Sequence, residues 1–139
     1  MSVEQNVAIC NRFVEEGLNQ GNILAVADQL ALPDLQLEAP GIPTAEGHAT
    51  GFDIFKQFVS MFTGAFPDLK CTLPYTIAED DIVAMDIAYS GTHAKQFGPF
   101  PATNNFVEGG ELWYVKFRDG KMAHIRICEY GTPLAAMIS

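Results

Sequence analysis

The chain has 139 residues, 48% of them hydrophobic, which is enough for one domain with a single core that needs neither disulfide nor metal. Its formal net charge of −9 comes from 17 acidic and 8 basic residues, and no run of Lys or Arg could follow a phosphate backbone. This balance excludes nucleic acid as an expected partner, and an acidic surface disfavours anionic membranes.

Two helices are predicted at the start of the chain. Ser2 and Gln5 have the spacing of a capping box, and apolar residues then recur every three or four positions, so a first helix is expected to end near 19–21. Asn22 can cap a second, shorter helix that runs to Leu30. Each helix carries one apolar face that must pack against another element.

The next segment is predicted to be mainly loop, followed by a third helix. Pro and Gly residues interrupt residues 34–50, so only a short strand at 35–38 is expected there. From residue 50 or 51, aromatic residues repeat at helical spacing until the turn at 65–68. The repeating aromatic residues are Phe52, Phe55, Phe58 and Phe62.

After Pro67 the hydrophobic period changes to two, which is typical of strands. Tight turns are expected at 79–81 and at Asp119–Gly120, and residues 93–104 form a longer loop. Within the third strand the pair Gly109–Gly110 indicates a bulge or a sharp bend. Four long antiparallel strands are predicted at residues 70–78, 82–92, 105–117 and 122–130.

Helices followed by an antiparallel sheet indicate an α+β fold, in which the helices cover one face of the sheet. The sheet must curve to enclose them, and a curved sheet around helices leaves a cone with room for one apolar pocket. No repeat or linker interrupts the sequence, so residues 1–139 are expected to form a single domain.

The cysteines and the N-terminus restrict the compartment and the chemistry. Cys10, Cys71 and Cys128 are odd in number and lack C-x-x-C spacing, so each is expected to be a small buried hydrophobe and no zinc site is predicted. The first residues lack the features of a signal peptide, and no apolar stretch has the length of a membrane span. We therefore expect a cytoplasmic protein.

Several short segments carry a family resemblance in order and spacing. They are Gly17-Leu18-Asn19-Gln20-Gly21-Asn22, Ala65-Phe66-Pro67-Asp68-Leu69, Gly91-Thr92-His93, Phe97-Gly98 with Pro101-Ala102-Thr103, and Phe117-Arg118-Asp119-Gly120-Lys121. Together they resemble the SnoaL-like polyketide cyclases of the nuclear transport factor 2-like superfamily, over almost the whole chain. The resemblance implies a conical barrel with a ligand cavity between sheet and helices. It also implies assembly through the outer sheet face, and we expect a homodimer.

Members of the superfamily have several functions, so the fold constrains the shape of the protein more than the reaction that it catalyses. It includes aldol-type cyclases, ketosteroid isomerase, epoxide hydrolases, dehydratases and non-catalytic binding modules. The site must therefore be argued from its residues.

The last predicted strand separates two sets of side chains by its alternation. One face carries His124, Arg126, Cys128 and Tyr130, and the other carries Ile125, Ile127 and Glu129. The polar set faces either solvent or the cavity, and since the final strand lines the cavity in this family, we predict that it faces the cavity.

On that prediction three residues are candidates for catalysis. His124 titrates near neutrality and suits a general acid or base. Arg126 would stabilise a developing enolate or alkoxide, and Glu111 would bring a carboxylate from the neighbouring strand. For the cavity wall and substrate binding we predict Phe13, Phe55, Phe58, Tyr89, Trp113, Cys128 and Tyr130.

The sequence also departs from the family. In the cyclases that it resembles, a His and an Asp carry the acid–base work, and Trp113 and Ile127 stand at or near those positions, whereas Arg126 matches a family arginine. His93 is expected to close a strand end, and His48 to lie in a solvated loop. The three histidines form no metal motif, so neither a metal nor a cofactor is expected.

The predicted function is a cofactor-independent cyclase or isomerase that acts by acid–base chemistry on a hydrophobic, oxygenated molecule of polyketide or terpenoid type. One alternative is a non-catalytic module that binds a small ligand, marked by a pocket without a buried carboxylate of perturbed pKa. The other is an epoxide hydrolase-like enzyme that uses Asp86, Glu111 and Arg126 to hold and activate a water. Asp86 is out of phase with its apolar neighbours, which would also suit a position facing water.

Overall fold

The computed structural model describes residues 2–39 and 49–139. Its helices are α1 (Val3–Arg12), the π-helix η1 (Phe13–Asn19), α2 (Ile23–Leu30), α3 (Phe52–Ala65) and α4 (Leu134–Met137). Its strands are β1 (Ala31–Glu38), β2 (Ala49–Thr50), β3 (Lys70–Glu79), β4 (Ile82–Thr92), β5 (Phe106–Arg118) and β6 (Lys121–Tyr130). The predicted α+β class and the four long strands are confirmed.

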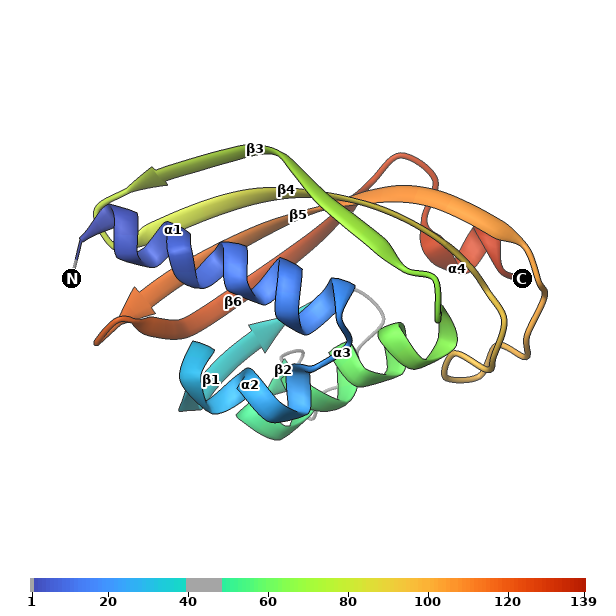
Figure 1. Ribbon diagram of the computed structural model, residues 1–139, viewed down its shortest axis with the longest axis horizontal. Helices are drawn as coiled ribbons and strands as arrows, with labels where there is room; N and C mark the ends of the chain where they lie inside the picture. The colour runs from blue at the N-terminus through green and yellow to red at the C-terminus, as the bar shows by residue number, and fades with distance from the viewer. Residues whose placement is uncertain (1, 40–48) are drawn as a thin grey trace.

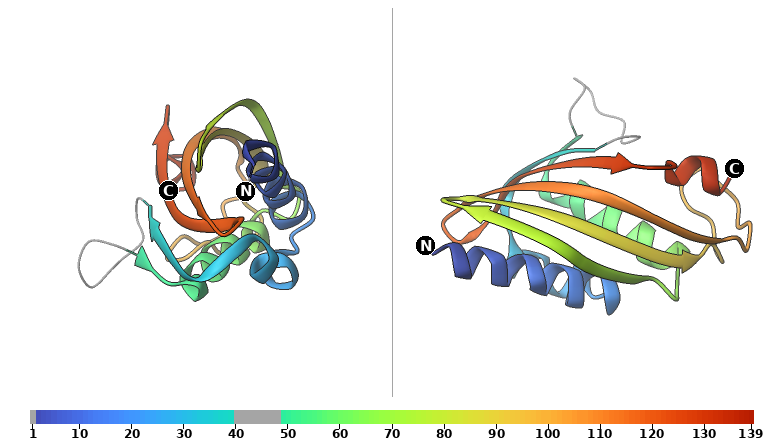
Figure 2. Two further views of the ribbon diagram at one scale, coloured as in Figure 1. Left: turned by 90° about the vertical axis from the view of Figure 1, so that its left-hand side faces the viewer. Right: turned by 90° about the horizontal axis from the view of Figure 1, so that it is seen from above.

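The strands form one curved sheet in the order β2-β1-β6-β5-β4-β3, which arches over the helices and does not close (Figures 1 and 2). All neighbours are antiparallel except β1 and β6, which are parallel. The expected purely antiparallel sheet was therefore wrong at β1, which is also longer than predicted. Pro33 fits into this strand because the β1–β6 register shifts between Ala31 and Gln36.

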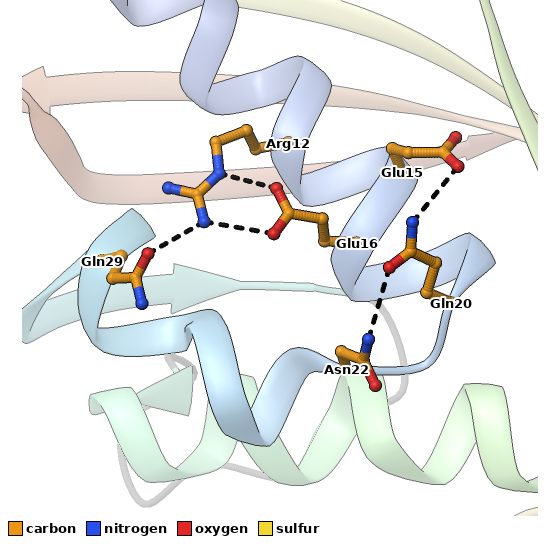
Figure 3. Close-up of polar contacts among 6 residues, drawn as sticks. All are labelled: Arg12, Glu15, Glu16, Gln20, Asn22 and Gln29. Carbon is orange, nitrogen blue, oxygen red and sulfur yellow. Dashed lines mark hydrogen bonds and ion pairs between the residues drawn. The ribbon is translucent and has the colours of Figure 1, made fainter.

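The first helix begins as predicted, since both hydrogen bonds of the capping box between Ser2 and Gln5 are present. It continues into η1 and ends at Asn19, within the predicted range. Arg12 joins it to the second helix, because its guanidinium donates to the Glu16 carboxylate at 2.6 and 3.2 Å and to Gln29 Oε1 at 2.9 Å (Figure 3).

The core lies between the helices and the concave face of the sheet. Phe13 is fully buried, with its ring centroid 5.7 Å from that of Phe55 and 4.9 Å from that of Trp113. Aromatic residues of a helix, a second helix and a strand thus meet at one point, where their large apolar area stabilises the contact between the layers.

Several of the segments that carry the family resemblance hold the fold together. Asn19 fixes η1 to β3, because its amide accepts from the Cys71 backbone N–H at 2.7 Å and donates to the Cys71 carbonyl at 3.0 Å. The Asp68 carboxylate accepts from the backbone N–H of Thr92 at 2.7 Å and from its hydroxyl at 2.8 Å. These motifs therefore specify the fold, which explains why they indicate the family without indicating the reaction.

The paired glycines of β5 do not form a bulge. The β4–β5 register runs without a shift through Gly109 and Gly110. A Cβ at Gly109 would overlap the ring of Tyr89, and one at Gly110 would overlap the ring of Tyr130. The glycines thus make room for two tyrosine rings, one on each face of the sheet, and the predicted bulge is corrected.

The three cysteines differ in their exposure to solvent. Cys10 and Cys71 are buried as expected, and burial raises the pKa of each thiol to about 12. Cys128 is exposed, so the expectation of burial was wrong for it, because it lies on the outer face of β6. Among the described residues, no helix has the length and hydropathy needed to cross a bilayer.

Candidate functional site

The structure contains a cavity of about 460 Å³. Among the elements that line it is α4, which lies at the end of the molecule that holds the C-terminus (Figure 1). The second half of α3, the loop between β4 and β5, the concave face of β5 and β6, and α4 enclose it. The lining residues are Phe58, Met61, Phe62, Phe97, Gly98, Pro99, Phe100, Glu111, Ile127, Glu129, Leu134 and Ala135. Most of this wall is apolar, and its polar side chains are two carboxylates.

Glu111 is the buried carboxylate of the cavity, with only 7% of the residue exposed. It lies on the inward face of β5 two residues from Trp113, whose indole N–H donates to Glu111 Oε1 at 2.9 Å. Burial raises the pKa of Glu111, the neighbouring Glu129 raises it further, and the indole hydrogen bond opposes both effects. Oε2 has no hydrogen-bond partner among the described residues.

Glu129 faces Glu111 directly across the β5–β6 ladder. Side chains opposite each other in an antiparallel pair have their Cβ atoms about 5 Å apart, so the two side chains are neighbours. The backbone N–H of Leu134 donates to Glu129 Oε2 at 2.9 Å, which fixes this side chain at the start of α4. The cavity therefore holds two facing carboxyl groups, each fixed by one hydrogen bond.

A third polar group lies beside this pair. Tyr89 is 4% exposed, and its hydroxyl lies over Gly109, the inward position next to Glu111 on β5. Its ring is perpendicular to that of Phe62, a lining residue, with the centroids 5.4 Å apart. No described residue accepts or donates a hydrogen bond at this hydroxyl. Burial, together with Glu111 and Glu129, raises the pKa of the phenol.

His124 and Arg126 do not line the cavity, so their predicted orientation was wrong. Both side chains lie on the outer face of the sheet and contact Glu38 Oε2, at 3.1 Å from His124 Nε2 and 2.7 Å from Arg126 Nε. The hydrogen bonds from Arg126 and His124 lower the pKa of Glu38 to about 2. The phase of β6 is inverted because Ile125 and Ile127 supply the apolar surface that the core requires, and Glu129 follows them inward.

The remaining predicted residues fall into three groups. Phe58 lines the cavity as predicted, whereas Phe13, Phe55 and Trp113 fill the core behind it. Tyr89 was predicted to line the cavity wall, but it is not among the lining residues and lies against Gly109 beside the carboxylates. Cys128 and Tyr130 lie on the outer face with the rest of their set, where the Tyr130 hydroxyl donates to Asp86. The prediction that these two bind substrate in the cavity is corrected for the same reason of strand phase.

The set proposed for epoxide opening does not converge. Asp86 and Arg126 lie on the outer face, whereas Glu111 lies on the inner face. His93 is fully buried, stacks on Phe66 and contacts Thr103 through Nδ1 at 2.9 Å, which fits its predicted role at the strand end. His48 lies outside the described residues. Within the described part of the chain, no group of three or more His, Cys, Asp or Glu could hold a metal ion.

Sequence reasoning missed Glu129 and the two segments that cover the cavity. Glu129 is in phase with Ile125 and Ile127 along β6, so it faces the interior once the core takes up those two isoleucines. For Phe97, Phe100 and Leu134 the sequence carried no such signal, since their positions follow from how the loop and α4 fold back onto the sheet.

The fold is an α+β arrangement in which a curved, open sheet covers helices and a cavity opens at one end. The pattern of the SnoaL-like polyketide cyclases matches residues 8–136, so the chain belongs to the SnoaL-like polyketide cyclase family. A comparison with curated protein sequences found no significant match.

Solved structures with the same fold include three informative examples. A proposed SnoaL-like polyketide cyclase from Jannaschia sp. CCS1 is 19% identical, with a TM-score of 0.84 over 98% of this chain and 92% of the other. AclR, a proposed hydroxylase from Streptomyces galilaeus, is 23% identical, with a TM-score of 0.80 over 99% and 97%. IdmH, a proposed polyketide cyclase from Streptomyces antibioticus, is 23% identical, with a TM-score of 0.75 over 96% and 95%. At these identities the similarity shows a shared fold alone.

Proposed function

We propose that the protein is a cofactor-independent cyclase or isomerase that acts by acid–base chemistry on a hydrophobic, oxygenated molecule of polyketide or terpenoid type. The observation that carries this proposal is Glu111, a buried carboxyl group with a raised pKa in an otherwise apolar cavity. A carboxyl group whose pKa is raised by burial is better suited to take up and return a proton, as a general acid or base must.

The proposed chemistry needs one proton acceptor and one donor. A carboxylate removes the proton alpha to a substrate carbonyl, and the C–H electron pair moves into the forming C=C bond while the carbonyl oxygen takes a proton from the second carboxyl group. Glu111 and Glu129 supply the two roles, because two facing carboxyl groups in an apolar site hold one proton more readily than two negative charges. The resulting enol is either reprotonated at another carbon or attacks a second carbonyl.

Trp113 is proposed as the positioning residue for Glu111. Its indole N–H occupies Oε1, which leaves Oε2 to face the substrate. Because Trp113 is only 2% exposed and packs against Phe13, its ring has one available position. The orientation of the catalytic carboxyl group is thus set by the core.

The alternative of a non-catalytic binding module is supported by one observation. The described residues that line the cavity include no Lys, Arg or His, so no cationic side chain stabilises a developing oxyanion. The proposed enzyme relies instead on a neutral donor, namely a protonated carboxyl group.

Exchange of carbon-bound hydrogen separates these two proposals. In D₂O, NMR would follow loss of the alpha-proton signal of β-tetralone, a bicyclic ketone that needs no further reactant to enolise. We expect the protein to accelerate exchange and Glu111→Gln to reduce that acceleration about 100-fold or more. His124→Ala, on the outer face, is the matched control and should exchange like the unmodified protein. Equal loss in both variants, or no acceleration at all, would favour the binding module.

We also propose that a second copy of the chain covers the outer face of the sheet. Four large apolar side chains are exposed there in two adjacent cross-strand rows, with a β4 residue in the middle of each. The rows are Tyr75–Asp86–Leu112 and Ile77–Ala84–Tyr114. A single symmetric contact would bury both rows at once, and the family resemblance implies assembly through this face.

A further inference from the structure

The charges of the cavity are all of one sign. Glu111 and Glu129 both face the space, and no basic residue lines it in the described part of the chain. An anionic ligand would therefore meet two acidic groups and no cation, at the cost of leaving its own charge desolvated and unpaired. The lining favours a ligand that is neutral or positively charged.

Four phenylalanine residues line the same cavity as the two carboxyl groups. Phe62 is buried, whereas Phe58, Phe97 and Phe100 are half-buried and keep part of their surface open. Phe97 and Phe100 are joined by reciprocal backbone hydrogen bonds of 2.9 Å, which hold both rings on the same short turn. An aromatic wall with a carboxylate at its base is the arrangement that binds organic cations, because ring faces and carboxylates both attract positive charge.

One carboxylate oxygen of Glu111 has unused hydrogen-bonding capacity at the cavity. Its Oε1 accepts from the Trp113 indole, whereas no described residue donates to Oε2, although Glu111 is only 7% exposed and lines the cavity. A ligand with N–H donors would be stabilised by donating to Oε2. A protonated amine offers up to three such donors together with the charge.

We propose that the substrate of this cavity is a hydrophobic molecule that carries a protonated amine, whose charge is held between Glu111 and Glu129 against the phenylalanine rings. The inference rests on the proposed function in one respect, that the cavity holds the substrate. It adds the charge of that substrate, which neither the family nor the fold specifies. A bound cation would also lower the pKa of Glu111, so that binding releases a proton wherever that group was protonated.

Three probes of equal ring size test the charge preference by isothermal titration calorimetry at neutral pH. They are naphthylmethylamine as the cation, naphthylmethanol as the neutral analogue and naphthoate as the anion. We expect the amine to bind about tenfold more tightly than the alcohol and the naphthoate about 100-fold more weakly than the amine. An alcohol that binds as well as the amine, or a naphthoate that binds best, overturns the inference without the need for any variant.

A double variant locates the effect. Glu111→Gln with Glu129→Gln should reduce the preference for the amine over the alcohol to less than about threefold. Glu108→Gln is the matched control, because it removes a carboxylate from the exposed, outer face of the same strand. If the control loses the preference to the same degree, the overall negative charge attracts the amine and the inference is wrong.

The same measurements distinguish this inference from the proposed function. A preference for the amine without any hydrogen exchange of ketones would leave a cation-binding module and overturn the enzyme. Exchange of ketones with equal binding of alcohol and amine would leave the enzyme and overturn the inference.

Discussion

The burial of Glu111 lowers the stability of the protein and also suits its carboxyl group to proton transfer. Its carboxyl group is buried beside a second carboxyl group, with one indole N–H as its only hydrogen-bond donor among the described residues. A raised pKa means that the folded protein holds this proton more tightly than the unfolded chain does. The free energy of unfolding should therefore fall as pH rises from about the ordinary value of 4.5 through the raised pKa.

Glu111→Gln should remove this dependence and stabilise the protein. Gln is neutral at every pH and can still accept the indole hydrogen bond. The free energy of unfolding of the variant should therefore exceed that of the unmodified protein by at least about 1 kcal/mol at pH ~8 and differ little from it at pH ~4. Denaturant unfolding across this range measures both values. The free energy of unfolding of the control Glu108→Gln should stay within about 0.5 kcal/mol of that of the unmodified protein at every pH. If Glu111→Gln is less stable than the unmodified protein at high pH, the assigned burial of Glu111 is contradicted.

At the scale of elements, β5 shows how a sequence pattern can be recognised and misinterpreted. Gly109 and Gly110 are not placed for backbone conformation, since neither has a positive φ. They leave space on opposite faces of one strand, which brings Tyr89 over the inner face next to Glu111 and Tyr130 over the outer face. The regular ladder through both glycines keeps Glu111 opposite Glu129.

Substitution of each glycine by Ala should have unequal cost. At Gly109 the new methyl group meets the ring of Tyr89, which is buried against Phe62, so Gly109→Ala should destabilise by about 2 kcal/mol through overpacking. At Gly110 it meets Tyr130, which is 48% exposed and can turn away, so the cost should stay below about 1 kcal/mol. Thermal unfolding of the two variants provides the comparison, and equal costs would mean that the Tyr89 ring is free to move.

The whole molecule has two faces of different character. The concave face of the sheet packs on α1 and α3, whereas the outer face exposes Tyr75 and Ile77 (each 72% exposed) together with Leu112 and Tyr114. Exposed apolar residues that adjoin one another indicate a surface meant to be covered. The hydrogen-bonded pairs Arg126–Glu38 and Tyr130–Asp86 lie on this same face.

Light scattering after gel filtration should give twice the mass of the chain for the unmodified protein. Ile77→Glu with Leu112→Glu places two charges in the proposed contact and should yield the monomer, since each unpaired charge would be desolvated there. Leu24→Glu is the control, because Leu24 is equally apolar and exposed but lies on α2. A monomer at all concentrations of the unmodified chain, or dissociation by Leu24→Glu, would contradict the assembly.

The sequence by itself determined the helices, the four long strands, the α+β class and the family, because hydrophobic period, capping residues and turn residues act locally. It also identified Glu111, since the alternation Glu111, Trp113, Val115 along β5 places that carboxylate with core residues. The tertiary structure alone decided which face of β6 points inward. A strand presents two faces, and only the demand of the core for Ile125 and Ile127 sends Glu129 into the cavity and His124 with Arg126 to the outside. The positions of the Phe97–Phe100 turn and α4 were likewise fixed by long-range packing, which no local pattern encodes.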